Sequence, residues 1–460
     1  MISEQVLNAL GLARASGSDL STPQTRARSE VDARQVVRAL VLEDDIGRVL
    51  LYAGADRFVD LQRIQAVTSR NLRGAPPEVT RELLADMRLE SLPALPRISG
   101  LPLLIDSEVL EKTEIYVDAG FADQMVLAPR NCYHTHLHEA LIDTYSTPID
   151  DLPEPAGGLP PPFDETRLLA ATRKFTELRV QQRLEDTLSI PPLSHTARAI
   201  MQLQADPTAS TAELAQIVEA DASLAAQVVG WASSPFYGAK YPVKSVQEAI
   251  IRVLGFDLVM NLALGLSLTE SIETPQDQPV GFCRYLGQSL YTAALTGALA
   301  GAMPRTLRPM HGTAYLAGLL HNYGHLVLAH VFAPHFSLVC RHLEVNPDLG
   351  RARIENHLLQ MTREEMAAWL LDMWHLPSEV TLAVHHQNDP EYAGEHHAFA
   401  NLLWLSTRLL RHRGFGDAPL EPIDEALLDR LGIDAPTAWA ALDTLMEQRD
   451  QLDEILRQLD

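Results

Sequence analysis

The sequence predicts a multidomain protein in which an N-terminal α+β domain is followed by an all-α helical bundle. Short β-branched runs come first, a proline- and glycine-rich stretch follows them, and helix-start signals recur from there to the C-terminus. The chain has 460 residues, more than one hydrophobic core usually supports, so we expect two or three domains.

A proline- and glycine-rich segment marks the boundary between the two parts. Residues 147–165 contain six prolines and two glycines, which indicates a linker. We expect proteases to cut first between Pro148 and Glu165 and to release two stable fragments. The expected parts are a mixed domain, a linker with a connecting helix, a helical bundle and an acidic helical extension, at 1–146, 147–180, 181–415 and 416–460.

Short apolar and β-branched runs in the first part predict a mixed sheet. Residues 36–42 and 49–52 flank a turn rich in acidic residues and glycine, which predicts a β-hairpin. Residues 101–105 and 115–117 predict further strands, and residues 77–88 predict a helix.

Helix-start signals recur after the linker, each ahead of apolar residues at helical spacing. A Ser or Thr followed three residues later by Glu predicts a capping box, which satisfies two backbone N–H groups at a helix start. The pairs are Ser210 with Glu213, Ser245 with Glu248, and Thr362 with Glu365. Gly255 and Pro377 are placed to end the second and third of these helices. The signals predict an all-α second domain.

An aromatic loop is expected where one of these helices ends. Asp221 can cap the helix start, and Pro235 disfavours helical backbone at the residue before it. Phe236 and Tyr237 follow directly. We expect them to pin the loop onto the bundle, with an exposed loop as the alternative.

The C-terminal extension is acidic and predicted to be helical. Residues 417–460 carry 12 acidic and 3 basic side chains. One helix is expected to carry a leucine stripe made of Leu442, Leu445, Leu452, Leu456 and Leu459. Its acidic face is either solvated or a docking surface.

Composition narrows the class of protein. The chain is 46% hydrophobic and 21% charged, as in folded soluble proteins. Its net charge of -23 repels phosphate backbones, so general nucleic-acid binding is disfavoured. Neither a signal-peptide core nor a membrane-length apolar run occurs, which predicts a cytoplasmic protein without a membrane partner. Cys132, Cys283 and Cys340 fit reduced thiols.

Motifs between about residues 181 and 415 resemble the HDOD family. They lie, in order, at 190–193, 218–229, 231–238, 245–250, 254–255, 317–325, 374–377 and 385–386. Ser233 stands where the family usually has asparagine. The resemblance implies a helical fold related to the HD phosphohydrolases and a role in bacterial signal transduction, sometimes near cyclic dinucleotide pathways.

The resemblance also implies where a hydrolase metal would bind. The metal lowers the pKa of a bound water and binds phosphoryl oxygens, and imidazole and carboxylate ligands suit it. The ligand positions correspond to Gln288, His321, Asn322 and Thr407. Since only His321 retains a suitable ligand, we predict a degenerate site without metal, cofactor or hydrolysis.

Three further histidines lie on neighbouring motifs. His325, His385 and His386 could form a ligand pocket or a displaced metal site. The alternative is histidines at helix ends that are satisfied by backbone groups. Adjacent helical residues point in different directions, so at most one of His385 and His386 would face the pocket.

The N-terminal domain resembles the YbaK/ProX family of aminoacyl-tRNA deacylases. The motifs that carry the resemblance lie at 36–42, 60–61, 100–106 and 117–120. The family has a lysine in the first motif, where this chain has Arg38, and its glycine-containing loop corresponds to residues 91–96, which lack glycine. Arginine does not simply replace lysine. We therefore predict an inactive deacylase-like domain whose pocket could still bind a small molecule or a partner.

A histidine-rich run precedes the linker. His134, His136 and His138 lie beside Cys132 and Glu139. On a strand the three imidazoles would share one face, and on a helix the first and third would pair. Either arrangement could hold zinc or nickel, and the alternative is ordinary polar residues near a domain edge.

Together these features predict a non-catalytic bacterial signalling protein that acts through a signalling partner protein or by sensing a small molecule or nucleotide. One alternative is an HD-type metal-dependent phosphohydrolase acting on nucleotides or cyclic di-GMP, which the replaced ligands oppose. The other is a residual aminoacyl-tRNA deacylase, which Arg38 and the negative charge oppose.

Overall fold

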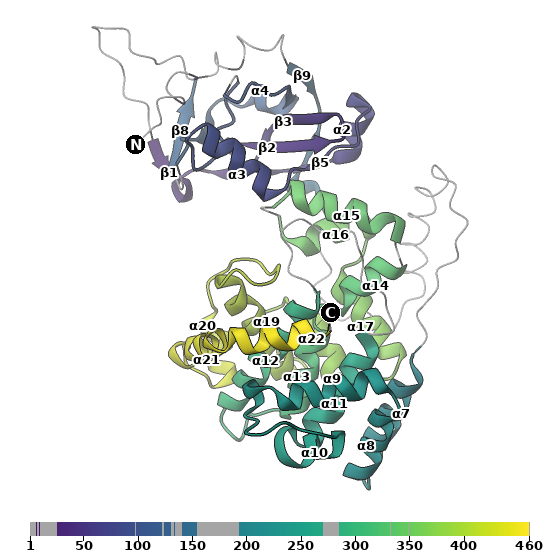
Figure 1. Cartoon of the computed structure of the whole chain (residues 1–460). Helices are drawn as coiled ribbons and strands as arrows, with labels where there is room; N and C mark the ends of the chain where they lie inside the picture. The colour runs from purple at the N-terminus through teal and green to yellow at the C-terminus, as the bar shows by residue number, and fades with distance from the viewer. Residues whose placement is uncertain are drawn as a thin grey trace. The chain divides into compact units, whose positions relative to one another are not determined.

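The chain forms two compact units in a computed structural model (Figure 1). The sheet unit comprises Met1–Glu154, Asp277–Gly281 and Ser337–Leu358, and the helical unit comprises Pro155–Gln276, Phe282–Phe336 and Leu359–Asp460. The structure describes residues 25–153, 193–269 and 285–459 except 97, 122–123, 130–132, 134–139, 332 and 348, together with Val6 and Ala9. The predicted fold class, a mixed sheet followed by helices, is confirmed.

A five-stranded sheet forms the centre of the sheet unit (Figure 1). Its strands, in spatial order, are β5 (Arg73–Gly74), β2 (Val37–Asp44), β3 (Gly47–Gly54), β6 (Leu103–Asp106) and β9 (Ala140–Asp143). β2 and β3 are antiparallel and joined by a two-residue turn, which confirms the predicted hairpin. β3 is apolar at consecutive positions because both of its faces are covered: Tyr52 belongs to one core and Leu51 to the other.

Two smaller sheets and three helices complete this part of the chain. β1 (Thr25–Ala27), β8 (Gln124–Ala128) and β7 (Ile115–Asp118) form one sheet, and β10 (Ser146–Pro148) pairs with β4 (Arg57–Val59). The helices are α2 (Leu61–Thr68), α3 (Pro77–Asp86) and α4 (Ser107–Glu111). The strands and helix predicted at 101–105, 115–117 and 77–88 correspond to β6, β7 and α3.

A helix pair from the middle of the expected bundle belongs to the sheet unit. α15 (Ala333–Val345) and α16 (Arg351–Leu359) contribute residues 337–358 to it. Val345 is buried in the same core as Leu51, and Ile354 is buried with Phe58 and Leu152. The sequence pattern did not predict that residues 337–358 belong to the sheet unit.

The helical unit is a bundle around helices that are apolar on all sides. Almost every described residue of α11 (Phe256–Thr269) and α13 (His311–Leu320) is buried, which is typical of central helices. α12 (Tyr285–Ala302) packs on α13, and a Cβ on Gly318 would lie 2.5 Å from the Ala293 Cα. Glycine at this position therefore lets the two backbones approach closely.

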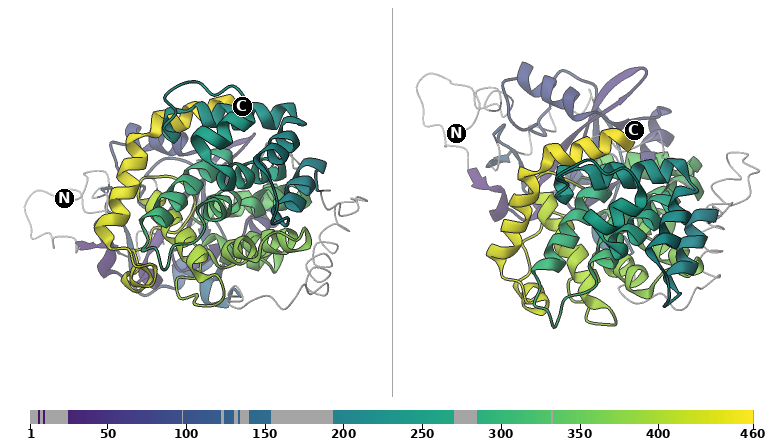
Figure 2. Two further views of the ribbon diagram at one scale, coloured as in Figure 1. Left: turned by 90° about the horizontal axis from the view of Figure 1, so that it is seen from below. Right: turned by 60° about the horizontal axis from the view of Figure 1, so that its bottom comes forward.

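Other helices surround this centre (Figure 2). They are α7 (His195–Gln204), α8 (Thr211–Glu219), α9 (Ala222–Ser233), α10 (Val246–Ala249), α14 (Tyr323–Val331), α17 (Arg363–Met373), α18 (Ser378–His386), α19 (His397–His412), α20 (Glu425–Leu431), α21 (Ala435–Glu447) and α22 (Arg449–Leu459). Within the described ranges, no helix has both the length and the apolar character needed to cross a bilayer.

Local start and stop signals agree with most of the predictions. Full capping boxes form at Ser210 and at Thr362. At Ser245 the box is half formed, because the Glu248 carboxylate accepts from the Lys244 N–H instead of the Ser245 N–H. α10 continues into a π-helical turn, Ile250–Leu254, which ends at Gly255 with φ of 81°.

Two expected helix ends differ from the structure. α17 ends at Met373, and Pro377 is instead the N-cap of α18, where its fixed φ is compatible with a helix start. The leucine stripe spans two helices instead of one, since the helix is interrupted at Gln448 between α21 and α22.

The aromatic loop forms a short 3-10 turn after α9. Asp221 caps α9, and Pro235, Phe236 and Tyr237 make up the turn. The Tyr237 hydroxyl is hydrogen-bonded to that of Tyr315 at 2.5 Å, so the loop is held on the bundle. Phe236 is half-buried and packs edge-on against Tyr237.

Candidate functional site

The residues expected at the degenerate metal site lie together in the helical unit. Gln288 comes from α12 and Asn322 from the end of α13, and the Asn322 amide donates to Gln288 Oε1 at 3.1 Å. Gln288 Nε2 in turn donates to Asp417 Oδ1 at 3.1 Å. Gln288 and Asn322 are buried, so their amides interact with protein groups instead of bulk water.

A buried arginine provides the positive charge of this cluster. Arg363, the first residue of α17, is 2% exposed. Its Nη1 donates to Asn322 Oδ1 at 3.2 Å and to Asp417 Oδ2 at 3.1 Å, and lies 3.4 Å from His325 Nδ1. An arginine side chain carries a fixed positive charge. We define Gln288, Asn322, Arg363 and Asp417 as the Arg363 cluster.

The backbone around Arg363 is also closely packed. A Cβ on Gly324, at the start of α14, would overlap the Arg363 carbonyl oxygen. Any larger residue would push α14 away from α17, so glycine is required for the arginine to reach the cluster.

His321 is buried beside the cluster and held by backbone groups. Its Nδ1 is 2.7 Å from the Gly318 carbonyl oxygen, and its own carbonyl accepts from Gln387 Nε2 at 2.7 Å. The ring is 5% exposed. A carbonyl partner requires Nδ1 to carry the proton, which leaves Nε2 as the nitrogen that could act as a ligand.

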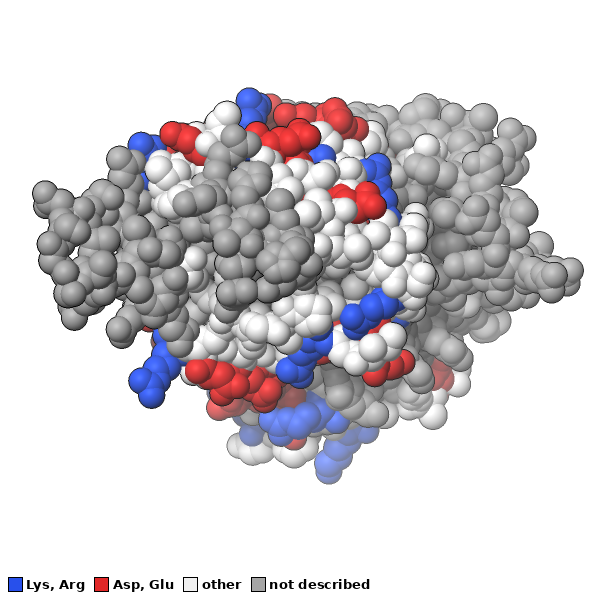
Figure 3. Space-filling model, turned by 90° about the horizontal axis from the view of Figure 1, so that it is seen from above, with Lys and Arg blue, Asp and Glu red and all other residues white. Residues whose placement is uncertain are grey.

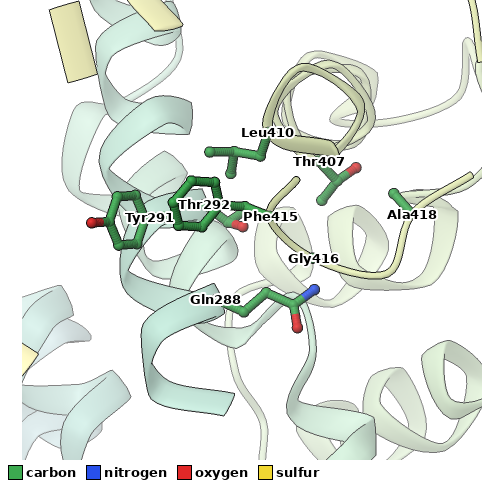
Figure 4. A pocket seen from close by; sticks show the side chains of 8 residues that line it. All are labelled: Gln288, Tyr291, Thr292, Thr407, Leu410, Phe415, Gly416 and Ala418. Carbon is green, nitrogen blue, oxygen red and sulfur yellow. The ribbon is translucent and has the colours of Figure 1, made fainter. Parts of the chain in front are cut away.

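Little space remains beside the cluster (Figure 4). The cavity next to Gln288 has a volume of about 10 Å³, and its lining includes Thr407 from α19. One water molecule needs about 10–15 Å³, so no nucleotide fits in this cavity.

Residues 415–418 close this cavity on one side (Figure 4). Phe415 stacks on Tyr291 with ring centroids 4.8 Å apart, and the Tyr291 hydroxyl donates to Asp453 Oδ1 at 2.7 Å. A Cβ on Gly416, whose φ is 77°, would lie 2.9 Å from Gln288 Nε2. The C-terminal extension therefore holds the closing segment through α22.

The three neighbouring histidines each pack against another ring. His325 packs edge-on against Phe336 at 5.0 Å, and His386 stacks on Tyr392 at 3.8 Å. His385 lies edge-on to His386 at 4.5 Å. Among the residues that the structure describes, no three His, Cys, Asp or Glu side chains are placed to hold a metal ion.

Burial dominates the ionisation of one of these histidines. His386 is 6% exposed, and burial, with a smaller effect from the charge of His385, lowers its pKa to about 4. The ring is therefore neutral at pH 7. The run His134, His136 and His138 lies outside the described residues, so the metal site considered there stays a prediction.

The Arg38 site lies in the sheet unit, where a lysine was expected from the family resemblance. Arg38, on β2, is 6% exposed, and its Nη2 donates to the Arg57 carbonyl at 3.0 Å and to Asn346 Oδ1 at 3.2 Å. Asn346 lies between α15 and α16. A side chain of the helix pair therefore occupies the space beside the arginine.

Sequence reasoning missed Arg363, Asp417 and Asn346. The capping box at Thr362 and Glu365 placed Arg363 in the first turn of a helix, but a local motif gives no direction for the side chain. Asp417 and Asn346 lie in connections without a periodic pattern, so only the tertiary structure brings them to these sites.

Two family models match separate parts of the chain. The HDOD domain matches residues 190–390, and the aminoacyl-tRNA editing domain matches residues 20–129. A candidate signal transduction protein from Marinobacter aquaeolei VT8, known from its crystal structure, is 39% identical in sequence to this chain. The two structures match with a TM-score of 0.84, and the match covers 100% of this chain and 99% of that chain. The chain belongs to the HDOD family.

A more distant solved structure resembles this chain in fold alone. An HDOD domain protein with unknown function from Geobacter sulfurreducens is 22% identical, with a TM-score of 0.50 and coverage of 64% of this chain and 98% of that chain. No curated protein matches the chain significantly. Both predicted resemblances, to HDOD proteins and to YbaK-like editing domains, are confirmed.

Proposed function

We propose that this HDOD protein is a non-catalytic bacterial signalling protein that acts by binding a protein partner or a small ligand. The signalling role is supported by the HDOD domain and by the relative from Marinobacter aquaeolei VT8. The observation that carries the non-catalytic part is the Arg363 guanidinium, bound between Asn322 and Asp417.

An arginine at this place opposes a catalytic metal. A guanidinium and a divalent ion about 4 Å apart would repel each other by roughly 8 kcal/mol at the effective dielectric of a partly buried site. The amides of Gln288 and Asn322 carry no negative charge to offset that repulsion. Asp417 is already paired with Arg363. The cluster thus neutralises itself without a metal.

A metal-dependent phosphohydrolase is the second candidate, because the cluster contains the carboxylate of Asp417 and His321 directly precedes Asn322 in the chain. A metal could use both side chains only if Arg363 left its present place. The cavity of about 10 Å³ leaves no room for a nucleotide or cyclic di-GMP unless residues 415–418 also move. Both movements would be needed together.

Residual aminoacyl-tRNA deacylation is a weaker alternative. Asn346 occupies the space beside Arg38. On the face drawn in Figure 3, the described acidic and basic side chains are interspersed instead of forming a broad basic surface. Such a surface gives little electrostatic attraction to the phosphate backbone of tRNA.

Hydrolysis assays test the proposal directly. The wild-type protein, assayed with manganese or magnesium, is expected not to cleave cyclic di-GMP or nucleotides. A variant that rebuilds the ligands and removes the cation, Gln288→His with Asn322→Asp, Thr407→Asp and Arg363→Gln, shows in parallel whether this scaffold can take up metal. Wild-type turnover that is abolished by His321→Ala would make the protein an enzyme.

A further inference from the structure

The helix pair α15 and α16 links the two sites along the chain. Residues 333–336 of α15 belong to the helical unit, and Ser337 onward belongs to the sheet unit. The chain returns at the other end, where Leu359, the last residue of α16, is again part of the helical unit. Both crossings fall inside helices, whose backbone is restrained by its own hydrogen bonds.

Both ends of this segment are tied to the Arg363 cluster. At the outgoing end, Phe336 packs on His325 with ring centroids 5.0 Å apart, and His325 Nδ1 lies 3.4 Å from Arg363 Nη1. At the returning end, Arg363 itself follows Leu359 after a single turn of chain, in which Gln360 has a φ of 59°. Both ends of the segment therefore lie near Arg363, one through the ring of His325 and the other along the chain.

The tip of the segment is bound within the sheet unit through Asn346. Its Oδ1 accepts from the Val59 N–H at 2.8 Å and from Arg38, while its Nδ2 donates to the Val59 carbonyl at 3.0 Å and to the His342 carbonyl at 2.9 Å. The carboxamide thus pairs with both backbone groups of Val59, as a neighbouring strand would do.

A second contact beside Asn346 fixes the orientation of α15. His342 is 1% exposed and stacks on Phe58 with ring centroids 5.5 Å apart and planes 10° apart. Its Nε2 accepts from the Leu61 N–H at 3.3 Å, and its Nδ1 donates to the Leu338 carbonyl at 2.8 Å. Val59 and Leu61 therefore each depend on a side chain of α15 or of the turn after it.

We propose that α15 and α16 couple the Arg363 cluster to the Arg38 site, so that a ligand or partner that displaces Arg363 also loosens the hold of Asn346 on Arg38 and Val59. The inference rests on the proposed function in treating both sites as regulatory. The contacts at the Arg363 cluster and at the Arg38 site each have a defined geometry, and the segment between them is helical.

Amide hydrogen exchange on the full-length protein, resolved to single residues, tests the coupling without any ligand. Arg363→Gln removes the cation at the cluster and is expected to speed exchange of the Val59 and Leu61 amides at least tenfold. Arg408→Gln is the matched control: Arg408 is also 2% exposed and pairs with a carboxylate, Glu421. It lies on α19, away from the two crossings along the chain.

Two further variants keep the test decisive. Asn346→Ala removes the hydrogen bonds to the Val59 backbone directly. Its exchange rate at the Val59 amide is therefore the upper limit for the other variants. Phe336→Ala disturbs the outgoing end without touching the charge and should give an intermediate rate if Arg363→Gln does not fold. The amides of β3 serve as an internal reference for global unfolding.

Unchanged Val59 and Leu61 exchange in Arg363→Gln and Phe336→Ala, or equal acceleration in Arg408→Gln, would overturn the coupling. Because exchange is measured without metal or substrate, the result is independent of the hydrolysis assay. A protein that hydrolyses cyclic di-GMP but shows the predicted exchange pattern would lose the non-catalytic function and keep the coupling.

Discussion

The helical unit buries Arg363 and the sheet unit buries Arg38, and the two guanidinium groups are held in different ways. Arg363 pairs with the carboxylate of Asp417, whereas Arg38 donates to the Arg57 carbonyl and to the Asn346 amide oxygen. The comparison indicates that Arg363 sets the charge of its site, while Arg38 fixes the position of a side chain from the helix pair. Loss of the first should disturb electrostatics, and loss of the second should disturb packing.

Cleavage of the linker tests which residues belong to the sheet unit. A single cut at 154–165 leaves α15 and α16 on the C-terminal fragment, while their partners Phe58, Leu152 and Val59 remain on the N-terminal one. We therefore expect the fragments to stay together under native conditions, contrary to the separable fragments that the sequence alone predicted. Size-exclusion chromatography after limited proteolysis measures this; elution of two separate folded fragments would contradict the assignment of residues 337–358 to the sheet unit.

Removing the cation from the helical unit should cost more stability than any other single change at these sites. Arg363→Met removes the cation that pairs with Asp417, and breaking a buried pair typically costs about 3–5 kcal/mol. Adding Asp417→Asn should restore much of the loss, as measured by urea unfolding. Arg457→Met, which removes an exposed pair with Glu454, is the control and should cost less than about 1 kcal/mol. If Arg363→Met lost no more stability than Arg457→Met, the ion pair between Arg363 and Asp417 would not behave as a buried pair.

In the sheet unit the corresponding change is expected to be smaller. Asn346→Ala leaves the N–H and carbonyl of Val59 and the Arg38 guanidinium without this partner, and an unsatisfied buried group costs about 1–3 kcal/mol. Asn71→Ala provides a control, since Asn71 accepts from Arg341 at the exposed side of the same helix pair. Equal unfolding midpoints for the two variants would remove the special role of Asn346.

The smallest effect concerns acid sensitivity of the helical unit. The pKa of His386 in the folded protein, about 4, lies below the value of about 6.5 in an unfolded chain. The contribution of this pKa difference to the free energy of unfolding is therefore fully present above about pH 6.5. It is lost as the pH falls toward 4, by roughly 1–2 kcal/mol once solvent screening is allowed for. His386→Phe, which preserves stacking on Tyr392, should unfold with less pH dependence over this range. Identical profiles would assign the acid sensitivity to other groups.

Local sequence patterns predicted much of the fold because they report local physics. The runs at 36–42 and 49–52 form the paired strands of the β2–β3 hairpin, and the boxes at Ser210 and Thr362 start helices where expected. Long-range placement was not predictable in this way. Residues 337–358 have ordinary helical composition, and nothing in them indicates that they pack on a sheet formed about 290 residues earlier.

The candidate site was predicted in part for the same reason. Family motifs led to Gln288, Asn322 and Thr407, and the structure brings these residues to one cluster and its adjoining cavity. Their assignment as former metal ligands stays a prediction. Arg363, which donates to Asn322, is 41 residues from it in sequence and meets it only after α17 packs on α14.

We propose that Arg363 occupies the place that a catalytic metal would need. Crystals of the wild-type protein soaked in manganese, with anomalous diffraction data, test it at the atomic level. We expect no anomalous peak among Gln288, His321, Asn322 and Asp417, and the Arg363 guanidinium in place between Asn322 and Asp417. A manganese peak bound by His321 and Asp417, with Arg363 displaced, would contradict the account.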